Sequence, residues 1–363
     1  MFEVTLVIPE RKTIHMKIKN RTVTALASSA LATVLVVGLG GFGLSTASAS
    51  AKLKSGQTFY LIPKDTVNPY ETLEDGGISM ALKSLGDKSV VSSGTLDTAA
   101  AQIPSIQAAI QHHAAGIVIA GNDPSALCPS LAQAHAAGLA IVSADSDISC
   151  PNHLFINQAN TAQIGTSEVD LLAKEIGSSG QIAILSAAAT ATNQNSWIKY
   201  MKVELKKYPK MKLVTTVYGN DDPATSLTVL QGLLSAYPNL RGIISPTTVG
   251  ISTAAQYLDT HKSLLKHLTL TGLGLPSQMK KYVLDGTVQS FELWNPINLG
   301  QLAGYAVANL ASGTITIKAG QSFAAPQLGK TFTILPAAAG TGPSVLLGPP
   351  FVFNKANVSK FNF

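Results

Sequence analysis

The sequence is poor in charged, aromatic and cysteine residues. Charged residues make up 13% of the 363 positions and aromatic residues 6%, and two residues are cysteine. No Lys or Arg cluster is interleaved with aromatic residues, which argues against nucleic-acid binding. Two cysteines are too few for a structural zinc site, which needs four ligands. Hydrophobic residues reach 46%, which is ample for two domains with full cores.

The usual catalytic signatures are also missing. The chain has no paired-carboxylate glycosidase pattern, no Gly-x-Ser-x-Gly elbow and no phosphate-binding loop. A Gly-x-Gly-x-x-Gly match at 38–43 follows no strand of a βαβ unit, so we set it aside. These absences favour a protein that binds its ligand without transforming it, and we expect no cofactor and no metal.

The N-terminus carries a targeting pattern. Residues 1–49 hold five of the 26 basic and two of the 20 acidic groups, so the formal charge of +6 falls to +3 for the remainder. A basic segment (16–21) precedes an apolar run (22–44) and an Ala-x-Ala cleavage site within 46–51. We predict an over-called start, initiation at Met16, and a signal peptide that sends the protein to the periplasm. An uncleaved membrane anchor is the alternative, because the run is near spanning length.

Cys128 and Cys150 are predicted to form a disulfide. An even cysteine count in an exported protein favours pairing, and two buried free thiols are the alternative. The bond would tie a helix start to the loop that follows the strand at 139–145, stiffening the surroundings of Asp145.

From residue 57 onward, short apolar runs alternate with segments of helical period. Such alternation predicts an α/β fold with parallel sheets covered by helices, and so many strands predict two lobes. The predicted strands lie at 57–63, 88–93, 115–121, 139–145, 153–157, 181–187, 212–219, 240–246, 268–274 and 287–294. The predicted helices lie at 69–85, 99–113, 124–137, 161–176, 195–208, 224–236, 249–258, 277–284 and 299–310.

Polar side chains follow nearly every predicted strand. In open parallel sheets ligands bind beyond the carboxyl ends of the strands, so these residues are the candidate site. The run at 190–195 offers amides and hydroxyls but no titratable group, which suits a neutral polyhydroxylated ligand. Charges and rings at other strand ends complete the inventory of a sugar pocket. They include Lys64, Asn68, Tyr70, Asn122, Asp145, Asp147, Pro246, Thr248, Trp294 and Asn295.

Several of these strand ends resemble a known family. The chain contains SAAATATNQNSW, VTTVYGNDD, AYPNLRGIISPTTVGISTAAQ, TGLGLPSQM and SFELWNPINLG. These strings resemble periplasmic rhamnose-binding proteins of ABC transporters. The closing LLGPPFVFNKANVSKFNF and the ALCPSL and DSDISC pair resemble the related autoinducer-2-binding branch. The resemblance spans about 57–363.

The resemblance implies a type I periplasmic binding protein. Its fold has two Rossmann-like lobes with parallel sheets, joined by hinge strands, with ligand in the cleft. On this basis we predict a first lobe of 55–146 and 297–315, and a second lobe of 147–296 and 316–363.

The resemblance also implies ligand contacts, position by position. The first lobe would supply Lys64, Asn68 and Tyr70, and Asp145 would accept from a pair of ligand hydroxyls. The other implied contacts are Asn193, Gln194, the Pro246 carbonyl, Thr248, Trp294 and Asn295. The autoinducer-2 branch carries an aspartate where this chain has Asn193, which favours a rhamnose-like sugar. By their residue types alone, Asp147 could be structural and Asn193 could be a helix cap.

We therefore expect a monomeric solute receptor of an ABC importer. It would close about its hinge on a neutral monosaccharide, with a rhamnose-like deoxyhexose favoured, and present it to a membrane permease. The alternatives are an autoinducer-2 receptor, a sensor subunit of a signalling kinase, and a sugar-modifying enzyme. The enzyme would have to rely on Asp145 and Lys64 as its acid–base pair.

Overall fold

The structure is a computed structural model that describes residues 52–337 and 342–363. The predicted signal peptide and its cleavage site at 46–51 lie outside these residues. Among the residues described, no helix combines the length and apolar character needed to cross a membrane.

The first lobe is built on a six-stranded sheet with the order β13-β5-β4-β3-β1-β2. All its neighbouring strands run parallel. Successive side chains of a strand point to opposite faces, and β1 shows this directly. Phe59 and Leu61 join one buried cluster, whereas Tyr60 and Ile62 join another. The strands are β1 (Thr58–Ile62), β2 (Lys88–Val91), β3 (Gly116–Ile119), β4 (Ala140–Ala144), β5 (Leu154–Asn157) and β13 (Ser344–Leu346).

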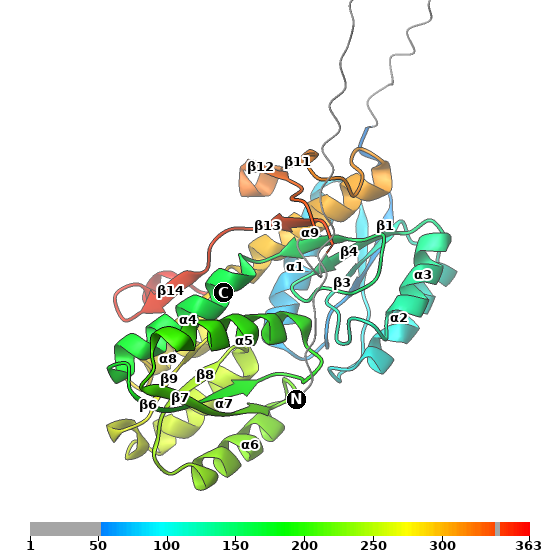
Figure 1. Cartoon of the computed structure of the whole chain (residues 1–363). Coiled ribbons are helices and arrows are strands. Elements are labelled where there is room, and N and C mark those ends of the chain that lie inside the picture. The colour runs from blue at the N-terminus through cyan, green and yellow to red at the C-terminus, as the bar shows by residue number, and fades with distance from the viewer. Residues whose placement is uncertain (1–51, 338–341) are drawn as a thin grey trace, which may run out of the picture. The chain divides into compact units, whose positions relative to one another are not determined.

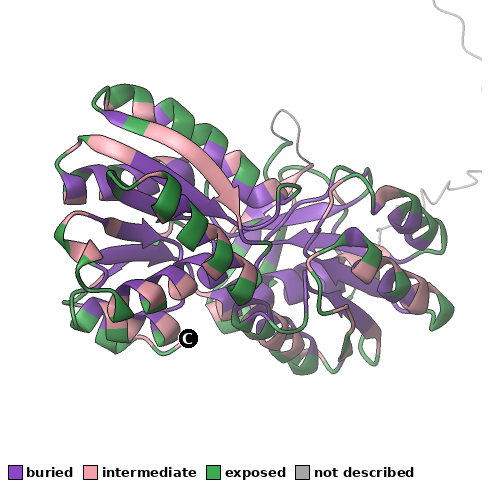
Figure 2. Ribbon diagram, turned by 90° about the horizontal axis from the view of Figure 1, so that it is seen from below, coloured by how far each residue is buried: buried purple, intermediate pink, exposed green. Residues whose placement is uncertain are grey.

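Helices cover both faces of this sheet (Figure 1). One face packs against α2 (Ala99–Gln111) and α3 (Cys128–Ala136). The other packs against α1 (Pro69–Ser84) and α9 (Pro296–Ser312). Most strands are buried, with the edge strand β2 partly exposed, while the outer sides of the helices are exposed (Figure 2).

The second lobe has a four-stranded parallel sheet with the order β7-β6-β8-β9. Its strands are β6 (Gly180–Ser186), β7 (Met211–Tyr218), β8 (Leu240–Ser245) and β9 (Thr269–Gly272). Its helices are α4 (Thr161–Ile176), α5 (Thr192–Glu204), α6 (Pro223–Ala236), α7 (Thr248–Thr260) and α8 (Pro276–Leu284). The α/β architecture with parallel sheets in two lobes is therefore confirmed.

Three segments cross between the lobes. The first follows β5 and enters α4, and the second follows β10 (Ser290–Leu293) and enters α9. The third follows β13 and enters β14 (Phe351–Asn354), which pairs antiparallel with β10. The backbone N–H of Leu347 donates to the Asn157 carbonyl at 3.0 Å, which joins the first and third crossings.

The crossings correct the predicted lobe boundaries. The prediction placed 147–157 in the second lobe, but β5 pairs with β4 of the first sheet. It also placed all of 316–363 there, although β13 pairs with β5. Two short strands, β11 (Ser322–Ala325) and β12 (Lys330–Thr333), form a hairpin beside α9. The boundary was set wrongly because a buried parallel strand carries no signal for which sheet it joins.

Helices α1 and α9 pack at unusually close range. A Cβ at Gly77 would lie 2.2 Å from the Ile297 carbonyl oxygen, and one at Gly300 would lie 2.0 Å from that of Glu74. Only glycine permits this approach of two backbones. Each helix starts with proline after an asparagine cap, Asn68 or Asn295, whose side chain accepts from a first-turn N–H. The first turns of both helices are thereby fixed.

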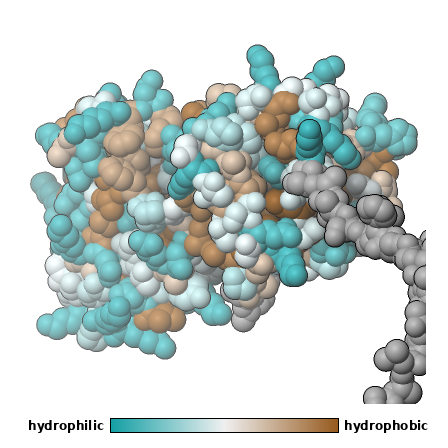
Figure 3. Space-filling model, turned by 90° about the horizontal axis from the view of Figure 1, so that it is seen from above, coloured by the Kyte–Doolittle hydropathy of each residue, from teal (hydrophilic) through white to brown (hydrophobic). Residues whose placement is uncertain are grey.

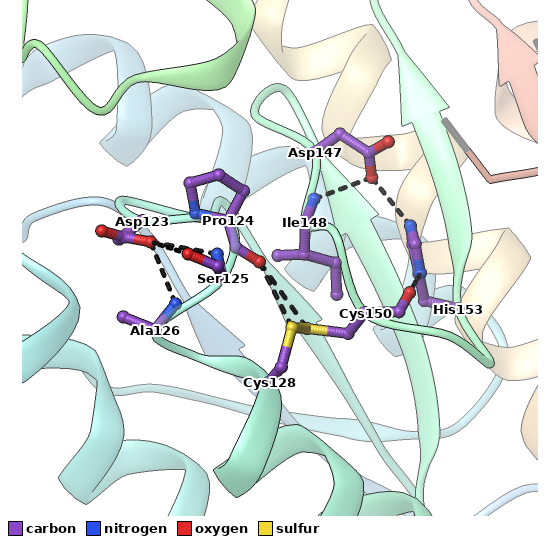
Figure 4. Close-up of a disulfide and its surroundings, with 9 residues drawn as sticks. All are labelled: Asp123, Pro124, Ser125, Ala126, Cys128, Asp147, Ile148, Cys150 and His153. Atoms are coloured by element: carbon purple, nitrogen blue, oxygen red, sulfur yellow. Dashed lines mark hydrogen bonds and ion pairs between the residues drawn. A yellow bond between two sulfur atoms is a disulfide. The ribbon is translucent and has the colours of Figure 1, made fainter. Parts of the chain in front are cut away.

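A disulfide joins Cys128 to Cys150, as predicted, with their Cα atoms 5.2 Å apart (Figure 4). The two residues are 22 positions apart. In the chain-entropy account, closing a loop of this size stabilises the fold by about 3 kcal/mol. The bond anchors the loop that begins at Asp145 to the start of α3.

One face of the surface mixes hydrophobic and hydrophilic residues. On the face in Figure 3, hydrophobic patches are interrupted by hydrophilic residues. Scattered apolar residues of this kind are ordinary on folded proteins.

Candidate functional site

A cavity with an open side lies where the strand ends of both lobes meet. The empty space between its lining side chains, together with the solvent space at its open side, is about 310 Å³. Nine of the twelve predicted contacts line it: Lys64, Asn68, Tyr70, Asp145, Asn193, Gln194, Pro246, Thr248 and Trp294.

Asp145 is the centre of the hydrogen-bond network. Its Oδ2 accepts from Lys64 Nζ at 2.8 Å and from Asn193 Nδ2 at 2.8 Å. Its Oδ1 accepts from Tyr70 OH at 3.1 Å and from Gln158 Nε2 at 3.3 Å. The residue itself has φ of 57°, a left-handed conformation that aspartate tolerates better than most residues. One carboxylate thus joins the first lobe, the first crossing and the second lobe.

Lys64 is a fully buried ammonium at the end of β1. Burial lowers its pKa, but the carboxylates of Asp145 and Glu71, with smaller contributions from two further aspartates, outweigh burial and hold the pKa above the ordinary value for lysine. Lys64 is therefore charged at neutral pH. Its ammonium is paired with the Asp145 carboxylate at 2.8 Å.

The second lobe contributes the amides of the first turn of α5. The helix begins at Thr192 after Ala191, three residues earlier than predicted, so Asn193 lies in the first turn and is not the cap. Its amide spans to Asp145 in the first lobe. The buried Gln194 Oε1 finds no hydrogen-bond partner among the residues described. An unpaired buried carbonyl is costly, and a donor in the cavity would relieve that cost.

Two tryptophans form the apolar wall. Trp294 follows β10 at the second crossing, and its ring lies 5.9 Å from that of Trp197, centroid to centroid. Trp294 Nε1 donates to Tyr70 OH at 2.7 Å, so the second crossing also reaches Asp145 through Tyr70. Aromatic faces of this kind suit the C–H faces of a sugar ring.

Three predicted contacts do not line the cavity. Asn122 donates to the Lys64 carbonyl at 2.7 Å, and its role is to hold the end of β1. Asp147 accepts from His153 Nε2 at 2.8 Å (Figure 4). It also accepts from Ser143 Oγ at 2.7 Å, and these contacts fix the disulfide loop. Asn295 caps α9. Asn122 Nδ2, Asp147 Oδ1 and Asn295 Oδ1 are thus engaged within the protein, and a ligand contact of these three residues stays a prediction.

Several lining residues were not predicted. Trp197 lies on α5, and nothing in its spacing along the chain separates a cavity residue from a core residue. Asp221 was not predicted because it belongs to the polar run NDDP, which is also typical of a helix start. The other unpredicted lining residues are Glu71, Thr247, Leu273 and Leu293.

This fold, with strand ends of two parallel sheets converging on one cavity, defines a two-lobe binding protein. A periplasmic binding protein domain matches residues 59–315 of the chain. The chain therefore belongs to the periplasmic binding protein family.

Solved structures agree with this membership. An ABC transporter solute binding protein from Clostridium phytofermentas with bound L-rhamnose is 39% identical, with a TM-score of 0.82. The match covers 85% of this chain and 98% of that one. A sugar ABC transporter protein from Actinomyces odontolyticus is 40% identical over 85% and 100% of the two chains, with a TM-score of 0.66. LsrB from Clostridium saccharobutylicum in complex with AI-2 is 25% identical over 84% and 100%, with a TM-score of 0.78.

Proposed function

We propose that this protein is the periplasmic receptor of an ABC importer for a neutral monosaccharide, with a rhamnose-like deoxyhexose favoured. The observation that carries the proposal is Asp145, a buried carboxylate that gathers donors from both lobes beside two tryptophan rings. Sugar hydroxyls can join such a network as donors and acceptors without any bond being made or broken.

The mechanism is closure about the crossings. The Asn193–Asp145 hydrogen bond is a direct link between the lobes, and a sugar that bridges the same groups would favour the closed arrangement. The closed form would then be presented to a membrane permease after export through the signal peptide. The 39% identity to a protein with bound L-rhamnose supports the choice of sugar.

The direct test is calorimetric titration with L-rhamnose, other 6-deoxyhexoses and pentoses. We expect one site per chain and a dissociation constant near micromolar, which corresponds to about −8 kcal/mol. Absence of heat with every neutral monosaccharide would refute sugar binding. Product analysis of the same mixtures by NMR tests the enzyme alternative, because new resonances would show that the sugar is transformed.

Asn193 separates the sugar receptor from an autoinducer-2 receptor. The autoinducer-2 branch that the sequence resembles has an aspartate there, so Asn193→Asp should weaken rhamnose binding at least tenfold and raise affinity for AI-2. The physical reason is that a second carboxylate would face Asp145, which now accepts from the Asn193 amide at 2.8 Å. Titrations of both ligands measure the change.

The matched control is Asn195→Asp, an exposed residue on the same helical turn. Its side chain donates to the Ala189 carbonyl, away from Asp145. If wild-type protein already binds AI-2 more tightly than any sugar, the autoinducer function replaces the sugar function.

A further inference from the structure

Asp221 lines the cavity, and its backbone has an unfavourable left-handed conformation. It follows β7, and both Asn220 and Asp221 have left-handed φ values, 54° and 49°. Two successive residues of this kind are unfavourable and persist where surrounding structure enforces them. The turn is closely packed at Gly219, where a Cβ would lie 2.1 Å from Ser226 Oγ, and the Gly219 N–H donates to the Ser186 carbonyl. Strain at a cavity wall points to function.

The side chain of Asp221 is buried and held in place by one neighbour. Thr247 Oγ1 donates to Asp221 Oδ1, and Thr247 is itself the residue before α7, flanked by Pro246 and Thr248 in the same wall. Burial raises the pKa of Asp221, while the Lys64 charge opposes that rise. A carboxylate in such surroundings gains from any hydroxyl that donates to it.

The cavity wall carries more acidic than basic side chains. The acidic residues are Glu71, Asp145 and Asp221, and the basic residue is Lys64, whose ammonium is bonded to Asp145 at 2.8 Å. Glu71 accepts from the Lys64 backbone N–H at 3.2 Å. A ligand carboxylate or phosphate would therefore meet the Asp221 side chain, and the only basic side chain among the lining residues is already paired with Asp145.

We propose that Asp221 is a second ligand-binding carboxylate, which accepts sugar hydroxyls from the second lobe and restricts the site to neutral sugars over uronic acids. This inference rests on the proposed sugar-receptor function and adds a residue and a selectivity to it. Asp145 serves the first lobe in the same way, so a bound sugar would be held by one carboxylate from each sheet.

The test compares Asp221→Asn with Asp222→Asn. Both remove one carboxylate from adjacent residues, but Asp222 is exposed and caps α6, a role that asparagine also performs. The probe is whichever of L-rhamnose, L-fucose and D-arabinose the wild type binds most tightly, with D-galacturonate and D-glucuronate as acidic probes. We expect Asp221→Asn to weaken the neutral sugar at least fivefold and Asp222→Asn to change it less than twofold. Wild-type affinity for both uronates should be at least a hundredfold weaker.

Each part can fail separately. A loss below fivefold in Asp221→Asn, with melting temperature and circular dichroism as in wild type, overturns the contact. The same loss in Asp222→Asn overturns it too, because a general charge effect would then explain both. A uronate bound within a hundredfold of the neutral sugar overturns the selectivity. Failure of the wild type to bind any neutral sugar is a different result, since it removes the proposed function itself.

Discussion

Replacing Asp145 with asparagine is expected to lower the affinity for the sugar more than a hundredfold. Asparagine keeps the size of the side chain and tolerates the left-handed backbone, so the loss reports on charge and acceptor number. Four donors converge on the present carboxylate, and an amide would turn one of its oxygens into a donor facing them. Lys64 would also lose its buried counter-charge. That loss costs folding stability. For the sugar, a hydrogen bond to a charged group contributes about 1.5–3 kcal/mol and each 1.4 kcal/mol is a tenfold change, so losing two such bonds lowers affinity more than a hundredfold.

Calorimetry and chemical denaturation together measure this effect. Asp147→Asn is the matched control, because Asp147 lies two residues on in the same loop but contacts Ser143 and His153 outside the cavity. The control should lose stability while keeping its affinity for the sugar. Unchanged affinity in Asp145→Asn would remove Asp145 from the site.

The second large effect is a loss of stability as pH rises. Glu168, Glu175 and Glu292 are carboxyl groups between α4 and β10, away from the cavity. Burial raises the pKa of Glu292 and of Glu175 to about 7. Burial, with the nearby Glu292, raises the pKa of Glu168 well above its ordinary value. Neither oxygen of Glu168 has a partner among the described residues, in keeping with a protonated group.

The direction of this pH effect follows from the difference in proton binding between the folded and unfolded states. In the unfolded chain these groups ionise near pH 4.5, whereas Glu292 in the folded chain holds its proton to about pH 7. The unfolded state therefore loses protons first, and the free energy of unfolding falls between these two pH values. The difference of about 2.5 pKa units corresponds to about 3 kcal/mol for Glu292.

Glu292→Gln tests this account. Glutamine can still accept from Ser167 Oγ, which now donates to Glu292 Oε2 at 2.7 Å. The variant should exceed wild type in unfolding free energy by about 3 kcal/mol at pH 8 and by less than about 1 kcal/mol at pH 4.5. Urea titrations at pH 4.5, 6 and 8 give both values. A gain that is the same at every pH would contradict the linkage and indicate a packing effect.

Sequence periodicity was sufficient to place the main elements of both sheets. The ten predicted strands all form, and most of them are buried parallel strands, which produce apolar runs that are easy to detect. The four later strands, β11 to β14, were missed. They are short and partly exposed, as in the pattern of Ser322–Ala325, so their apolar content is diluted. The sheet to which β5 belongs could not be predicted either, because the residues of a strand do not specify its pairing partner.

Some cavity residues could likewise be predicted from the sequence, and others could not. Strand ends are predictable from the geometry of parallel sheets, which explains why Lys64 and Asp145 were found. Whether a polar strand-end residue faces the ligand or braces the loop depends on its neighbours in space. Asp147 is used by His153, and Asn122 is used by the Lys64 carbonyl. Neither partner could be identified from spacing along the chain.

Trp197 and Trp294 are the two tryptophans in the whole sequence, and both line the same cavity. All indole emission of the protein therefore originates at the cavity wall, with no background from tryptophan elsewhere. The Trp294 N–H is further engaged by Tyr70, whose hydroxyl contacts Asp145. The molecule thus carries a native optical reporter, which can follow occupancy and its kinetics in unlabelled protein.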